Sequence, residues 1–142
     1  MRTTLRLLLA MLGVSAVGIA LGDMLAGGAA TAGFFEHLFA ALTGWRGPDS
    51  GPWPPTMDNE LRFYAAMWGG YGILLLFVAK DWRARQGLVP WLAALFFAGG
   101  LGRALSCIAI GPPHPLFIVL MWIELLLPPI LVVLWWRVRG PI

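Results

Sequence analysis

The chain has 142 residues, of which 59% are hydrophobic and only 12% are charged, whereas a soluble domain carries about a quarter charged residues. This composition excludes a water-soluble globular domain and an intrinsically disordered chain, and it leaves a small integral membrane protein whose surroundings are the lipid bilayer. The net charge is only +3 and the basic residues are scattered, so we expect no nucleic-acid partner.

Four apolar runs are long enough to cross a bilayer, which takes about 20 residues. Because backbone groups in lipid must satisfy their own hydrogen bonds, we expect each run to form a helix. The predicted helices span about residues 5–25, 61–79, 88–110 and 115–136. The sequence therefore predicts an all-α membrane protein, a four-transmembrane-helix bundle that forms a single domain over residues 1–142.

The first run also has features of a cleavable signal peptide. Arg2 and Arg6 precede the apolar stretch, and the small residues GGAATA follow it at 27–32. Gly18 and Gly22, four residues apart, favour instead a helix that packs closely against a neighbour. We expect a retained first helix, with a removed signal peptide as the alternative.

The connection between the first two predicted helices is by far the longest. Its segment 33–45 carries apolar side chains at helical spacing, namely Phe34, Phe35, Leu38, Phe39 and Leu42. This spacing predicts a short amphipathic helix, which either lies on the membrane surface or caps the bundle.

The positive charges predict how the bundle is oriented. Seven of the ten Lys and Arg residues fall on one side of a four-span layout, namely Arg2, Arg6, Lys80, Arg83, Arg85, Arg137 and Arg139. Positive residues concentrate on the cytoplasmic side of membrane proteins. We therefore expect both termini in the cytoplasm, the long loop in the periplasm, and the protein in a bacterial inner membrane.

Two charged residues lie inside the predicted helices. Arg103 precedes the end of the third helix, and Glu124 follows the start of the fourth, so both lie roughly 10–14 Å from the same membrane face. Ionised side chains in lipid cost at least about 2.5–3.5 kcal/mol each and usually pair or line a cavity. We expect Arg103 and Glu124 to lie within salt-bridge distance, either as a structural pair or as part of a ligand or proton site.

Several further polar residues fall in the same outer half of the membrane. We predict a polar cluster that either binds a ligand or is structural, made of Asp23, Glu60, Arg62, Tyr64, Arg103, Ser106 and Glu124. It would surround a cavity that opens towards the periplasm and is capped by the segment from Phe34 to Trp45. The opposite charges nearly cancel, which favours a neutral or zwitterionic guest over a nucleotide or a metal ion.

Cysteine and histidine usage removes several reaction classes. Cys107 is the only cysteine, and the two histidines, His37 and His114, lie outside the apolar runs. An internal disulfide, a CxxC redox pair, a multi-cysteine metal site and a haem between two membrane helices are therefore not expected. With no nucleophile–base set in view, we predict no catalytic residues, no metal site and no cofactor, and we favour a non-enzymatic role.

Three blocks of sequence resemble a known family. They are DNELRFYAAMWGGYG at 58–72, GGLGRALS at 99–106, and IEL ahead of Pro128 and Pro129, with a GPPHP turn between the last two. Together they resemble the small bacterial four-helix membrane proteins called domain of unknown function 4345, over most of the chain. The resemblance implies a four-helix fold and no established activity. The layout is also similar to that of DoxX-like membrane proteins, some of which accompany oxidoreductases.

These observations lead to a function of the binding class. We expect a module that binds a lipid or small amphiphile in the outer cavity, or an accessory subunit that contacts a membrane-protein partner or a second copy of the chain. The alternative is a small proton-coupled multidrug-type transporter, which also has four helices and a membrane carboxylate. The strong charge bias and the expected pairing of Glu124 count against that alternative.

Overall fold

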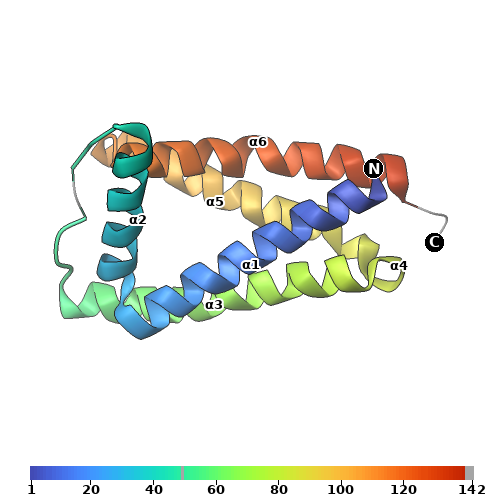
Figure 1. Ribbon diagram of the computed structural model, residues 1–142, viewed down its shortest axis with the longest axis horizontal. Coiled ribbons are helices and arrows are strands. Elements are labelled where there is room, and N and C mark those ends of the chain that lie inside the picture. The colour runs from blue at the N-terminus through green and yellow to red at the C-terminus, as the bar shows by residue number, and fades with distance from the viewer. Residues whose placement is uncertain (49, 140–142) are drawn as a thin grey trace.

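The computed structural model describes residues 1–48 and 50–139, and within these residues the secondary structure is entirely helical (Figure 1). The elements are α1 (Arg2–Ala26), α2 (Gly28–Thr43), α3 (Pro55–Lys80), the short α4 (Trp82–Arg85), the 3-10 turn η1 (Gln86–Leu88), α5 (Val89–Ile110) and α6 (Pro115–Val138).

Four of these helical segments are long and apolar enough to cross a membrane. They are α1, α3, α4 continued through α5, and α6. The prediction of a multi-pass helical membrane protein is therefore confirmed at this level. Helix α3 begins at Pro55, earlier than the predicted residue 61, because proline suits the first turn of a helix and Pro54 before it is extended.

The long helices form two antiparallel pairs. Helix α1 packs mainly on α3, and α5 packs mainly on α6. Figure 1 shows that α1 runs diagonally across the bundle, from near the carboxyl end of α6 to the amino end of α3. The amino end of α1 and the carboxyl end of α6 lie at one end of the bundle, which we call the terminal end, and α2 lies at the other, which we call the α2 end.

The α1–α3 pair depends on a close approach between two glycines. A Cβ atom at Gly72 would lie only 2.9 Å from the carbonyl oxygen of Gly13. A Cβ atom at Gly13 would likewise lie 2.9 Å from the carbonyl oxygen of Gly72. Small residues of this kind let membrane helices pack backbone to backbone.

Side chains from all four long helices meet at the terminal end. We call this cluster the inner core; its fully buried aliphatic members include Leu5, Leu9, Leu75, Val78, Val89 and Leu131. Within the α1–α3 pair, Nε of Arg6 donates to the carbonyl oxygen of Ala79 at 2.8 Å at the same end. The terminal end is therefore filled by well-packed side chains.

Helix α2 crosses the opposite end of the bundle, roughly perpendicular to the long helices (Figure 1). It contacts α1, α3 and α6, so this part of the long connection caps the bundle. Its buried side includes Thr31 and Glu36, whereas Phe34, Leu38 and Leu42 are exposed. An exposed apolar stripe of this kind suits a helix at a membrane interface.

The rest of the connection is held against α2 by a buried carboxylate. Glu36 is only 2% exposed, and its two oxygens accept hydrogen bonds from the Ser50 hydroxyl at 2.6 Å and from the Ser50 backbone N–H at 2.9 Å. A buried carboxylate needs such donors to offset its lost hydration. This contact closes the loop over the α2 end.

Candidate functional site

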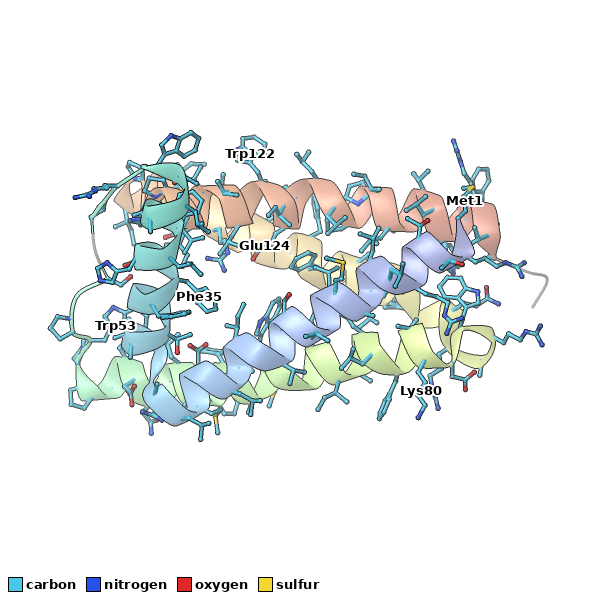
Figure 2. All side chains as sticks on the ribbon, viewed as in Figure 1. Met1, Phe35, Trp53, Lys80, Trp122 and Glu124 are labelled. Carbon is cyan, nitrogen blue, oxygen red and sulfur yellow. The ribbon has the colours of Figure 1, made fainter. Side chains whose placement is uncertain are left out.

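A cavity of about 860 Å³ lies between the two helix pairs at the α2 end. This volume falls within the range of roughly 300–1,000 Å³ that is usual for ligand pockets. Its wall is mostly apolar and aromatic, and every long helix, α2 and the connection contribute to it. Figure 2 shows Phe35 of α2 and Glu124 of α6 on opposite sides of this region, with Trp53 of the connection near the end of the bundle.

Five of the residues that line the cavity are exposed. They are Ser15 and Gly18 of α1, Phe35 of α2, Ser106 of α5 and Ile123 of α6. Stacked aromatic rings lie between α3 and α5.

The wall between α3 and α5 is formed by three aromatic rings. The rings of Trp68 and Tyr71 are stacked with centroids 5.1 Å apart, and the Phe96 ring lies 6.1 Å from that of Trp68. The Tyr71 hydroxyl donates to the carbonyl oxygen of Leu92 at 3.0 Å. These aromatic faces border the cavity just above the inner core.

The predicted ion pair is present in the cavity wall. Nε of Arg103 lies 2.8 Å from Oε2 of Glu124, so the prediction of salt-bridge distance is confirmed. The Glu124 side chain is only 8% exposed and that of Arg103 is 38% exposed. Cζ of Arg103 also lies 5.7 Å from the centre of the Phe117 ring, a cation–π geometry.

Glycines on α5 make room for this pair. A Cβ atom at Gly100 would lie 3.0 Å from Cβ of Glu124, so any larger residue would push α6 away. The tight turn from 111 to 114 brings α5 and α6 together, and His114 accepts a hydrogen bond from the Leu116 backbone N–H at the start of α6. The ion pair therefore follows from the turn and from the small residues on α5.

Asp23, at the last turn of α1, also lines the cavity. It is half-buried and lies beside Thr31 of α2, whose hydroxyl donates to the carbonyl oxygen of Gly27. Among the described residues, Asp23 takes part in no ion pair. Ser106 of α5 completes the polar residues that the sequence analysis named and that reach the cavity.

The other three residues of the predicted cluster do not line the cavity. Glu60 and Tyr64 are exposed, and Arg62 pairs with Asp58 at 2.8 Å while it also donates to the carbonyl oxygen of Met24. Their position along the helix correctly predicts that they lie at the α2 end. It does not predict which way they face, because successive residues are rotated by about 100° around the helix axis. The face of α3 towards the cavity carries Leu61, Trp68 and Tyr71 instead.

Two features of the site were not expected from the sequence. Glu36 was overlooked, although a lone carboxylate among the phenylalanines of 34–39 is a usable signal for a buried contact. The aromatic wall was also missed, although Trp68 and Tyr71 stand three residues apart on one helix and so share a face.

In the part of the chain that the structure describes, no group of three or more His, Cys, Asp or Glu side chains is arranged to hold a metal ion.

Comparison with known proteins gives a family but no neighbour of known structure. No curated protein and no solved structure matches the chain, so the similarity of its layout to DoxX-like proteins stays a prediction. One family, described as Domain of unknown function (DUF4345), matches residues 4–135, which is almost the whole chain and includes all four long helices. The chain therefore belongs to the DUF4345 family, as its sequence blocks had indicated.

Proposed function

We propose that this protein binds a single lipid or small amphiphile in the cavity at the α2 end. The observation that carries the proposal is the cavity itself, which is large enough for a ligand and has a mostly apolar wall with a few polar groups. The apolar part of the guest would lie against the aromatic wall of Trp68, Tyr71 and Phe96. Its polar group would lie near one of the charged side chains in the wall, which are Asp23, Arg103 and Glu124.

The route into the cavity supports a guest that is dissolved in the membrane. Four exposed lining residues lie on long apolar helices, namely Ser15, Gly18, Ser106 and Ile123. In a membrane, an amphiphile would reach them by lateral diffusion, whereas a water-soluble ligand would have to cross lipid. We therefore place the guest among membrane-soluble molecules.

We further propose that the protein resides in a bacterial inner membrane with both termini in the cytoplasm. The amino end of α1 and the carboxyl end of α6 lie at one end of the bundle (Figure 1), and Lys80 at the end of α3 and Arg83 and Arg85 of α4 belong to that end. This positive charge favours the cytoplasmic side, so the cavity would lie towards the periplasm. Reporter fusions in the α2–α3 connection and at the carboxyl terminus would give periplasmic and cytoplasmic signals respectively.

The ion pair bears on the transporter alternative. A proton-coupled transporter of the multidrug type needs a membrane carboxylate that exchanges protons freely. Glu124 is held by Arg103 at 2.8 Å, which supports a binding role over that alternative. An accessory role with a membrane-protein partner or a second copy of the chain remains a prediction.

Two matched glycine variants test the proposed binding. Gly18 lines the cavity and Gly70 does not, yet both lie on long helices, and a Cβ atom added at either position would meet no other atom within 4 Å. The protein and both variants are purified in mild detergent, and the amphiphiles that remain bound are extracted, identified and quantified by mass spectrometry. We expect a stoichiometric guest in the original chain and in Gly70→Phe, and its loss in Gly18→Phe, where the ring fills the cavity. A guest absent from all three, or retained equally in both variants, would contradict the proposal.

A further inference from the structure

The charges inside the cavity point to a more specific guest. We propose that the cavity selects an amphiphile with a positively charged amine head group, which pairs with Asp23; this rests on the proposed function above. The inference comes from which charged side chains the fold turns into the cavity and which it turns away. It replaces the neutral or zwitterionic guest that the sequence alone had favoured.

Among the described residues, three formally charged side chains line the cavity, and two of them neutralise each other. Arg103 donates to Glu124 at 2.8 Å and also lies over the Phe117 ring, so its positive charge already has two partners. Asp23 stands apart from this pair, at the last turn of α1. The cavity is therefore left with one negative charge that no lining cation balances.

The nearest basic residue on the neighbouring helix is committed elsewhere. Arg62 of α3 donates to the Asp58 carboxylate at 2.8 Å and to the carbonyl oxygen of Met24, and it does not line the cavity. Glu60, which the sequence analysis had counted into the same network, is exposed. The near-neutral balance expected from the sequence is thus lost, because the fold keeps both Glu60 and Arg62 outside.

The cap does not supply a cation either. Its described residues that line the cavity are all uncharged, namely Gly28, Thr31, Ala32, Phe35, Ser50 and Trp53. The Thr31 hydroxyl beside Asp23 is neutral, so it leaves the charge of the carboxylate unbalanced. An unpaired carboxylate in a mostly apolar site is costly, so a cation that enters the cavity gains from pairing with it.

Aromatic side chains at the α2 end provide a second preference for a cation. Phe35 of α2 and Trp53 of the connection line the cavity at the end where Asp23 also lies. Aromatic faces attract ammonium groups through the ring quadrupole, most strongly where water is displaced. A carboxylate and several aromatic rings around one apolar space form the combination that recognises an alkylammonium group. A sulfate or phosphate head group would gain neither interaction.

The single cysteine of the chain is a reporter for this test. Cys107 lines the cavity and is half-buried, so an occupant should slow its reaction with the small neutral reagent N-ethylmaleimide. The full chain is reconstituted in phosphatidylcholine vesicles and titrated with decyltrimethylammonium, decanol or decyl sulfate. These probes share one chain length and differ in head-group charge.

We expect the ammonium probe to protect Cys107 at about a tenfold lower concentration than decanol, which corresponds to one favourable charge contact. Asp23→Asn should bring the ammonium probe to the level of decanol. Glu60→Gln removes an exposed carboxylate at the same end but outside the cavity, so it should leave the preference unchanged. Circular dichroism of each variant checks that the helices are intact.

The outcomes separate this inference from the proposed function. If decanol and the ammonium probe protect Cys107 equally, or if Asp23→Asn keeps the preference, the cationic guest is wrong while amphiphile binding stands. If decyl sulfate protects best, the charge argument is reversed and also wrong. If no probe protects Cys107 at any concentration that leaves the vesicles intact, the proposed function itself fails.

Discussion

At the terminal end of the bundle, side chains from all four long helices interlock, whereas at the α2 end the same helices enclose a cavity of about 860 Å³. The inward positions at the terminal end carry large aliphatic side chains such as Leu5, Leu75 and Leu131. At the α2 end, small residues such as Ala16, Gly28 and Ala32 take their place.

The two ends also differ in how they treat polar groups. Among the described residues, the buried charged side chains are Glu36 and Glu124, which both lie towards the α2 end, and Asp23 and Arg103 line the cavity there as well. Membrane helices gain no hydrophobic free energy from packing against each other, so close contact has to hold the terminal end together. The α2 end can then contain a cavity and charged side chains while the helices stay together at the terminal end.

The largest expected effect comes from breaking the ion pair at the open end. Arg103→Leu leaves the Glu124 carboxylate buried without its partner, which should lower the free energy of unfolding by about 3–5 kcal/mol. Glu124→Leu should lower the free energy of unfolding by less, because the Arg103 side chain that it leaves without a partner is 38% exposed and is therefore less desolvated than Glu124. The double variant should be milder than the sum of the two. Detergent-solubilised thermal and chemical unfolding measures all three.

A matched control for this effect is Arg62→Leu at the same end of the bundle. Arg62 and Asp58 are each 38% exposed, and an exposed i,i+4 pair is worth only about 0–1 kcal/mol. If Arg62→Leu were as damaging as Arg103→Leu, or if the Arg103 and Glu124 effects simply added, the pair would not be the coupled element described above.

A pair of leucine truncations compares the packing of the two ends directly. Leu75 is 1% exposed in the inner core, whereas Leu120 of α6 already borders the cavity. Leu75→Ala creates a new void and should cost about 2–4 kcal/mol, while Leu120→Ala only enlarges an existing one and should cost under about 1 kcal/mol. Unfolding midpoints of the two variants in one detergent give the difference. Equal losses would mean that the cavity wall is as tightly packed as the inner core.

Some features of this structure can be predicted from the sequence because they depend on the length of an apolar run or on a short connection. The four long helices are predictable because a membrane requires about 20 apolar residues per span, and the runs from 5 to 136 meet that length. The pair of Arg103 and Glu124 is predictable because the turn at 111–114 fixes α5 against α6 at a known depth. Both predictions rest on length and local connection.

The cavity lining is harder to predict because it depends on how each helix is rotated. Glu60, Arg62 and Tyr64 lie at the predicted level but on the outer faces of α3, since the close contact of Gly13 with Gly72 sets how α3 meets α1. That contact joins residues 59 positions apart, and no local pattern reveals it. The position of α2 depends in the same way on contacts with three other helices.

The smallest expected effect lies at the boundary between the two ends, at Tyr71. Its hydroxyl donates to the carbonyl oxygen of Leu92 at 3.0 Å and joins α3 to α5 just where the inner core gives way to the cavity. Tyr71→Phe keeps the ring stacked on Trp68 and removes only this hydrogen bond, so it should lower the free energy of unfolding by about 0.5–1.5 kcal/mol.

Tyr64→Phe on the same helix is the control, because Tyr64 is 58% exposed and its hydroxyl makes no hydrogen bond within the described residues. The unfolding free energy of this variant should not change. A loss well above this range for Tyr71→Phe would mean that the hydroxyl, and not the aromatic stack, holds the two helix pairs together at the floor of the cavity. Unfolding of both variants side by side in one detergent distinguishes the two cases.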